Sequence, residues 1–125
     1  MSPRTWIIVG AVMGALAVGT GAFGAHGLKD RLQESGTFDT YETAVRYQMY
    51  HALALVLVGL IGLQFSAPAL NIAGLCFTAG IVIFSGLLYG IALGGPKILG
   101  AIVPIGGLGF IAGWIALAVA ALAKK

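Results

Sequence analysis

The sequence predicts an all-α fold, an integral membrane bundle of four transmembrane helices with a short amphipathic surface helix between the first and second. Four long apolar stretches fill most of the 125 residues, and hydrophobic residues make up 59% of the chain against 9% for charged ones. A helix needs about 20 apolar residues to cross a bilayer. Most of the charge lies in a polar island at residues 29–46. We therefore expect a single transmembrane domain over residues 1–125 rather than a water-soluble core.

The first span and the connection after it are predicted from a change in composition. Residues 5–25 carry no charged side chain, which suits a transmembrane helix. A polar connection follows at residues 26–39, where Leu28 and Leu32 stand four residues apart among charged side chains. Residues at this spacing share one face of a helix, so we expect a short amphipathic helix on the membrane surface.

The second span is predicted at residues 40–65. Asp39 and Glu42 have the spacing of a capping box, which places the start of this helix near Thr40. A helix of about 26 residues is about 39 Å long at its normal rise per residue. This length exceeds the hydrocarbon thickness of about 30 Å, so the first two turns are expected to project through the headgroups.

Two further spans are predicted at residues 69–93 and 98–123. A Gly-Gly-Pro sequence at residues 94–96 ends the third span. Pro104 lies within the fourth span and is followed closely by three glycines. Because proline lacks the amide proton of a regular helix, we expect a kink or a locally unwound turn there.

Missing residue types argue against several classes of function. Lys and Arg number seven against four Asp and Glu, and no basic run could follow a phosphate backbone, so nucleic-acid binding is not expected. No carboxylate lies deep in a predicted span, which argues against proton- or sodium-coupled transport. No nucleophile lies beside a base, so we expect no enzyme. Cys76 is the only cysteine, which leaves neither an internal disulfide nor a thiolate metal site.

Twenty glycines form a second strong pattern, because helices in lipid associate through close backbone packing. Three sets have the small-xxx-small spacing that permits this approach: Gly10 and Gly14, whose face Gly21 extends; Gly86, Gly90 and Gly94; Gly109 and Gly113. One interpretation is that all three sets hold the four helices of one chain together. The other is that the set at residues 86–94 forms a contact in a homo-oligomer.

Two histidines are candidates for a binding site. His26 closes the first span and His51 lies about three turns into the second, so both belong to the same side of the membrane. Paired histidines can ligate haem iron or a divalent metal, or pass a proton. In the structural interpretation, His26 bonds a carbonyl left free at the helix end, and His51 bonds Tyr47 or a neighbouring backbone. The spacing assigns no metal and no cofactor, and leaves haem and quinone open.

Arg46 lies near the hydrocarbon edge, where an arginine can contact an anion or a lipid headgroup. It can also extend to the interface or pair with Glu42 one turn earlier. The candidate polar site comprises the polar and aromatic residues on this side of the membrane: His26, Arg46, Tyr47, Gln48, Tyr50 and His51. Membrane orientation stays open, because the basic residues divide almost evenly between the two sides: Arg4, Lys124 and Lys125 against Lys29, Arg31, Arg46 and Lys97.

Three strings carry a resemblance to a known family. They read GAFGAHGL at residues 21–28, TAVRYQMYHALAL at residues 43–55 and FSGLLYG at residues 84–90. The chain resembles the YgdD and YwdK family of uncharacterised small bacterial membrane proteins, which has a eukaryotic member called transmembrane protein 256. The resemblance implies a four-helix protein of the bacterial inner membrane with a domain of unknown function. It supplies no catalytic residues.

These observations favour a small membrane protein that acts by association with itself, with lipid or with a larger membrane complex. The competing hypothesis is a binder of haem, quinone or lipid seated between His26 and His51. A channel or uncoupled transporter is a third hypothesis, and it rests only on the segment that follows Pro104.

Overall fold

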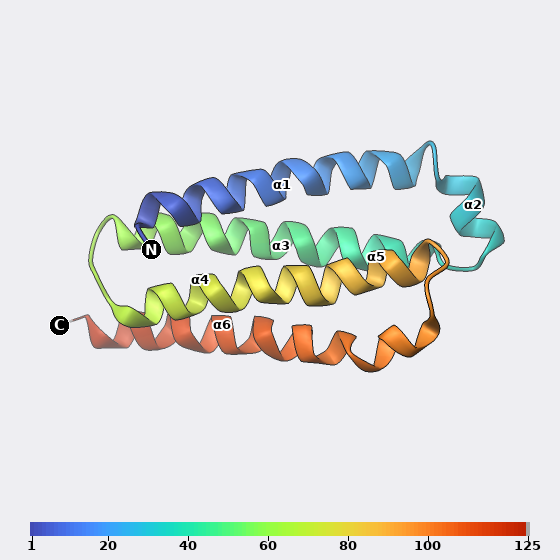
Figure 1. The fold of residues 1–125 in the computed structure, drawn as a ribbon. Coiled ribbons are helices and arrows are strands. Elements are labelled where there is room, and N and C mark those ends of the chain that lie inside the picture. Colours follow the sequence, from blue (N-terminus) through green and yellow to red (C-terminus); the bar gives the residue numbers. More distant parts are fainter. Residues whose placement is uncertain (125) are drawn as a thin grey trace.

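The computed structural model describes residues 1–124, which form helices joined by short connections (Figure 1). In chain order its elements are α1 (Pro3–Ala25), α2 (Lys29–Glu34), α3 (Phe38–Gly62), α4 (Pro68–Gly80), the π-helical turn η1 (Ile81–Ser85), α5 (Gly86–Ala92), the 3-10 helix η2 (Lys97–Ala101) and α6 (Val103–Ala123). Lys125 lies outside the described residues.

Four helical segments are long and apolar enough to cross a membrane: Pro3–Ala25, Phe38–Gly62, Pro68–Ala92 and Lys97–Ala123. Their ends lie close to the expected ranges, and no strand occurs in the described part of the chain. The predicted fold class, four transmembrane helices with a short helix between the first two, is therefore confirmed. That the whole chain forms one domain stays a prediction.

The spans pack in a defined order. α1 lies mainly against α3, α3 also contacts α4 and α5, and α6 lies against α4 and η1. Both termini lie at one end of the bundle, and α2 lies at the opposite end (Figure 1). The chain therefore presents a distinct α2 end, where α1 ends, α3 begins and α5 turns into η2.

Glycines allow α1 and α3 to approach closely. A Cβ added to Gly10 would lie 2.7 Å from the carbonyl oxygen of Ala52, and one added to Gly24 would overlap the ring of Tyr41. Gly59 of α3 makes a similar close approach to α1. Because lipid supplies no hydrophobic drive for association, such backbone contact stabilises the pair of helices.

The three predicted glycine sets have different surroundings. Two sets lie in contacts within the chain: Gly10, Gly14 and Gly21 against α3, and Gly109 and Gly113 against α4. In the remaining set, a Cβ added to Gly86 would meet nothing within 4 Å. Gly94 has a φ of 104°, which suits glycine at the turn after α5. A Cβ added to Gly90 would lie 3.8 Å from a methyl carbon of Leu99 in η2, so this set has only one contact within the chain, and its role stays a prediction.

α2 closes its end of the bundle through one buried side chain. Leu32 is fully buried against Tyr41 and Ala92, while the rest of the helix is exposed. This is the arrangement expected of an amphipathic surface helix.

The predicted capping box is not formed, and α3 begins at Phe38 rather than near Thr40. Thr37 is the N-cap residue, but its hydroxyl accepts no hydrogen bond from the first amides of α3 and instead donates to the carbonyl oxygen of Ala92 at 2.8 Å. The prediction was wrong because α3 begins one residue before Asp39, which places Asp39 in the first turn instead of at the N-cap.

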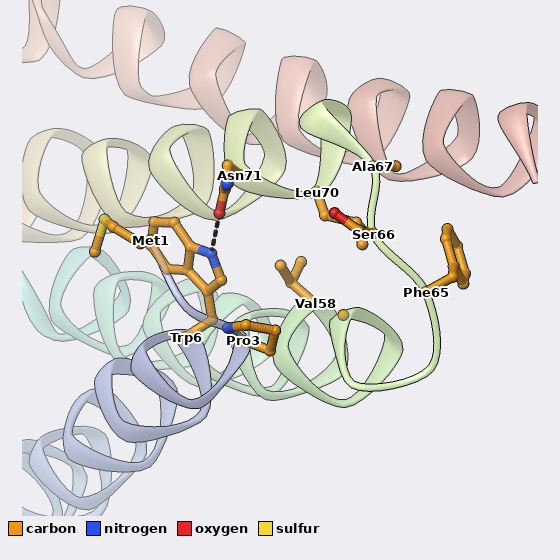
Figure 2. Close-up of a pocket in the computed structure, with 10 residues that line it drawn as sticks. Met1, Pro3, Trp6, Val58, Phe65, Ser66, Ala67, Leu70 and Asn71 are labelled. Carbon is orange, nitrogen blue, oxygen red and sulfur yellow. Dashed lines mark hydrogen bonds between the residues drawn. The ribbon is translucent and has the colours of Figure 1, made fainter.

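Trp6 anchors α1 to α4 near the other end of the bundle. Its indole N–H donates to Oδ1 of Asn71 at 2.9 Å beside a small cavity of about 60 Å³ (Figure 2). A Cβ added to Gly74 would overlap the indole ring, so the glycine makes room for it. The tryptophan is thus buried with its polar atom satisfied.

The third span contains a π-helical turn that the sequence did not predict. η1 separates α4 from α5, and within it the buried hydroxyl of Ser85 donates to the carbonyl oxygen of Ala44 at 2.8 Å. Such turns occur mostly singly inside α-helices, frequently at functional sites. The turn also brings Phe84 toward α6.

The fourth span is irregular before α6 begins. η2 is a 3-10 helix, and α6 starts at Val103 with Pro104 in its first turn. Proline is favoured in this position, because the first amides of a helix have no intrahelical partner. The break expected near Pro104 therefore precedes α6 and does not kink it.

Candidate functional site

The structure divides the predicted polar site among different surroundings. Tyr47 and His51 line a groove between α3 and α6, whereas Gln48 bonds to groups on α1 and α5. Arg46 and Tyr50 are exposed on the outside of α3. These residues are close in sequence, but successive helical positions point in different directions.

His26 lies apart from His51. It ends α1, where its backbone N–H donates to the carbonyl oxygens of Ala22 and Phe23, and its side chain is exposed. His51 lies near the middle of α3, about 20 Å along the helix axis from its start at Phe38. The expectation of a site between the two histidines is therefore not met.

Both ring nitrogens of His51 are engaged within the chain. Nδ1 lies 2.7 Å from the carbonyl oxygen of Tyr47, so this nitrogen carries the proton and donates. Nε2 accepts a hydrogen bond from the indole N–H of Trp114 at 3.2 Å. The imidazole is also stacked on Phe110, with ring centres 3.6 Å apart. A haem iron or metal ion at Nε2 would have to displace Trp114, so these contacts do not fit an axial ligand.

A groove of about 630 Å³ opens beside His51, between α3, η1 and α6. Four aromatic side chains form its walls: Tyr47, Phe84, Phe110 and Trp114. The ring centres of Tyr47 and Phe84 are 4.8 Å apart, and those of Phe84 and Phe110 are 5.4 Å apart. The groove is completed by residues of α6: Pro104, Gly107, Leu108 and Ile111.

Two glycines at the start of α6 shape this groove. A Cβ added to Gly106 would lie 2.5 Å from the backbone nitrogen of Phe84, so this glycine lets η1 and α6 meet. A Cβ added to Gly107 would lie 3.8 Å from the ring of Phe84, which is ordinary contact. Position 107 therefore borders open space in the groove.

The groove lies within the spanning segments and faces outward. His51 and Trp114 lie near the middle of their helices, and the side chain of Trp114 is 44% exposed although it belongs to a transmembrane helix. Side chains exposed at this depth meet lipid rather than water. The groove is therefore accessible to molecules dissolved in the bilayer.

A separate hydrogen-bonded network joins α1, α3 and α5. Nε2 of Gln48 donates to the carbonyl oxygen of Met13 at 3.0 Å, and the hydroxyl of Tyr89 donates to Oε1 of Gln48 at 2.7 Å. The hydroxyl oxygen of Thr20 lies 3.0 Å from the hydroxyl oxygen of Tyr89. The hydroxyl of Tyr41 donates a hydrogen bond to the carbonyl oxygen of Thr20. Gln48 therefore connects three helices, which is the role expected of polar side chains between transmembrane helices.

Three aromatic residues of the groove were missed by sequence reasoning: Phe84, Phe110 and Trp114. Trp114 offered a usable signal, because an indole N–H in the middle of an apolar span needs an acceptor. Its partner could not be predicted, since hydropathy locates spans but does not say how they are rotated or which helices are neighbours.

Comparison with known proteins gives consistent matches over most of the chain. A family model described as a protein of unknown function (DUF423) matches residues 20–107. A UPF0382 membrane protein of Staphylococcus epidermidis is 50% identical over 119 residues, which cover 95% of this chain and 96% of that protein. The UPF0382 membrane protein YwdK of Bacillus subtilis is 44% identical over 120 residues, with 95% and 97% covered. No solved structure matches the chain.

Proposed function

Because this chain belongs to the DUF423 family of membrane proteins, a family of unknown function, we propose its function from the geometry of the groove. The protein binds a lipid-soluble molecule with a flat, carbonyl-bearing ring, of the quinone class, beside His51. The observation that carries this proposal is an aromatic groove open to lipid in the middle of the spans. The resemblance to the YwdK family is confirmed by the relatives described above.

The chemistry of the groove supports a ring-bearing ligand. Flat rings stack on aromatic side chains, and Tyr47, Phe84 and Trp114 offer such surfaces. The hydroxyl of Tyr47 is a donor suited to a carbonyl oxygen, and water does not compete for it in hydrocarbon. The volume of about 630 Å³ lies within the range of about 300 to 1,000 Å³ usual for ligand sites.

We propose binding without catalysis. The support is that the contacts of His51 with Tyr47 and Trp114 occupy both ring nitrogens, so this histidine has a structural role in the groove wall. A channel is not proposed, because the segment after Pro104 packs against Phe84 through Gly106.

Fluorescence of Trp114 tests the proposal in protein reconstituted into phosphatidylcholine vesicles and titrated with a short-chain ubiquinone, since quinones quench indole emission. The chain has two tryptophans, so a Trp6→Phe variant reports on Trp114 alone. We expect quenching that saturates. A Trp114→Phe variant reports on Trp6, which is only 2% exposed and lies outside the groove, and it should show no saturable component.

A groove-filling substitution supplies a second arm of this test. Gly107→Leu places a side chain in the groove and should abolish saturable quenching of Trp114. Gly19→Leu is the matched control, because a Cβ there meets nothing within 4 Å on the exposed side of α1. Quenching that rises linearly without saturating, or that is unchanged by Gly107→Leu, contradicts the proposal.

Self-association is a second candidate, favoured by the open surroundings of Gly86. This glycine has the small-xxx-small spacing yet meets nothing within 4 Å, so its face is available to a second copy or to another membrane protein. In a Cys76→Ala background, a Gly86→Cys variant should form disulfide-linked dimers in native membranes. A Gly19→Cys variant should not, and equal crosslinking at both positions would count against this interface.

We also propose that the protein resides in the inner (plasma) membrane of a bacterium, with the lipid bilayer as its constant partner. The support is that its relatives in Staphylococcus epidermidis and Bacillus subtilis are named membrane proteins. Fractionation of the native cells should recover the protein in the plasma-membrane fraction, which is the inner-membrane fraction where the cells also have an outer membrane.

A further inference from the structure

A second cavity lies at the α2 end of the bundle and has a different chemical character. It has a volume of about 320 Å³ and is bounded by α2, the residues before α3 and the turn between α5 and η2. Two of its lining residues, Arg31 and Lys97, are basic, and none is acidic. It shares no residue with the groove beside His51.

Arg31 is held at this cavity by the chain itself. One of its guanidinium nitrogens, Nη2, donates to the carbonyl oxygen of Leu93 at 3.0 Å. This bond places the positive charge at the carbonyl end of α5, where a cation is favoured. A guanidinium has five N–H donors in a rigid plane, so further donors remain for a second acceptor.

The hydroxyl groups of the cavity are already committed within the chain. Thr37 donates to the carbonyl oxygen of Ala92 at 2.8 Å. Oγ of Ser35 lies 2.6 Å from Oγ1 of Thr37 and 3.2 Å from the carbonyl oxygen of Leu32. The donors that the cavity offers a ligand are therefore those of Arg31 and Lys97.

We propose that this cavity binds a phosphate group between Arg31 and Lys97. The planar guanidinium of an arginine can donate hydrogen bonds to two phosphate oxygens at once. A lysine adds a compact positive charge on a flexible side chain. The α2 end lies just beyond the spanning segments, at the level of lipid headgroups, where phosphodiester groups are abundant. A free phosphate from the aqueous phase has the same recognition chemistry, so the test separates these two sources.

Native mass spectrometry of the full chain in a mild detergent measures the binding, with phosphatidylglycerol, phosphatidylcholine and inorganic phosphate as separate probes. We expect Arg31→Gln and Lys97→Gln each to weaken binding about tenfold or more, as for loss of a hydrogen bond to a charged group. Lys97→Gln leaves the bond between Arg31 and Leu93 intact, so it tests the site without loosening α2.

Two matched variants control for general surface charge. Arg46→Gln and Lys29→Gln each remove one positive charge from the same end of the bundle, and neither residue lines the cavity. Binding of phosphatidylglycerol that only the cavity variants weaken supports a headgroup site, and binding of inorganic phosphate with the same dependence supports a soluble source. Equal losses in the control variants, or no loss in Lys97→Gln, overturn the proposal. Support for the phosphate site or its failure leaves the proposed quinone binding untouched, because none of these variants changes a residue of the groove.

Discussion

At the scale of single residues, several polar side chains inside the spans are paired between helices. Trp6 donates to Asn71, Ser85 donates to the backbone of α3, and Trp114 donates to His51. No buried side-chain nitrogen or oxygen lacks a partner among residues 1–124. Because an unpaired polar group in hydrocarbon costs several kcal/mol in general, these pairs fix how neighbouring helices face each other.

The pair of Trp6 and Asn71 gives a direct test at this scale. Asn71→Ala leaves the indole N–H without its acceptor at 2.9 Å, so the free energy of unfolding should fall. In a double-mutant cycle with Trp6→Phe, we expect a coupling free energy of about 0.6 to 1.7 kcal/mol, the range found for hydrogen bonds between transmembrane helices. Unfolding in sodium dodecyl sulfate measures it. Strictly additive effects of the two substitutions would mean that this bond does not join α1 to α4.

At the scale of helices, close backbone approach matters more than side-chain bulk in the contact between α1 and α3. Gly10, Gly24 and Gly59 each lie where a Cβ would meet the facing helix. Gly19 lies on the same helix as Gly10, but a Cβ there would meet nothing within 4 Å. A glycine is therefore needed on the face of α1 that packs against α3, and it is not needed for packing on the exposed face.

Alanine substitutions at these two positions should separate the faces. In Gly10→Ala the new Cβ would lie 2.7 Å from the carbonyl oxygen of Ala52, so α1 has to move away from α3. We expect a loss of about 1 to 3 kcal/mol in the free energy of unfolding, as for overpacking in a core. Gly19→Ala should leave stability unchanged or raise it slightly. Similar losses in both variants would argue against the close contact between these helices.

The π-helical turn yields a second prediction for an element. Val82 is an exposed residue of η1, and a π turn holds one residue more than an α-helix needs for the same hydrogen-bonded turn. Deleting Val82 should therefore turn η1 into a regular α-helical turn. The side chains of α4 and α5 should keep pointing toward the same neighbouring helices. Deleting the exposed Leu75 of α4 should instead rotate one part of the span by about 100° relative to the other.

Thermal unfolding of these two deletion variants in detergent is the measurement. We expect the chain without Val82 to stay folded and the chain without Leu75 to lose most of its stability, since its faces no longer meet α3 and α6. If the two deletions were equally damaging, η1 would not be a locally inserted turn.

At the scale of the whole molecule, hydropathy was sufficient for the existence of four spans, and the spacing of Leu28 and Leu32 indicated the surface helix. Apolar length and the Gly-Gly-Pro sequence at residues 94–96 located the third span, but its uniform apolar composition gave no sign of η1. The capping box at Asp39 and Glu42 was a wrong prediction, because the N-cap residue of α3 is Thr37 and Asp39 lies within the first turn. Local patterns thus predicted where helices lie, whereas contacts between helices decided their details.

The candidate site was predicted only in part, for a physical reason. Tyr47, Gln48 and His51 were grouped because they are close in sequence, but the rotation of α3 directs Gln48 toward α1 and His51 toward α6. His26 was grouped with His51 because both lie on one side of the membrane, yet their depths differ. Depth follows from counting residues along a helix, whereas the facing partner depends on the packing of all four spans.

The central claim is that the groove beside His51 holds a ring-bearing, lipid-soluble ligand. The most direct test is photocrosslinking with a photoreactive ubiquinone analogue in membranes, followed by mass spectrometry to locate the labelled residues. The account predicts label concentrated on the groove walls, at Tyr47, Phe84 and Ile111, and displaced by unmodified ubiquinone. Label spread over the lipid-facing side of α1, at positions such as Ile8 and Val12, and not displaced by ubiquinone would contradict it.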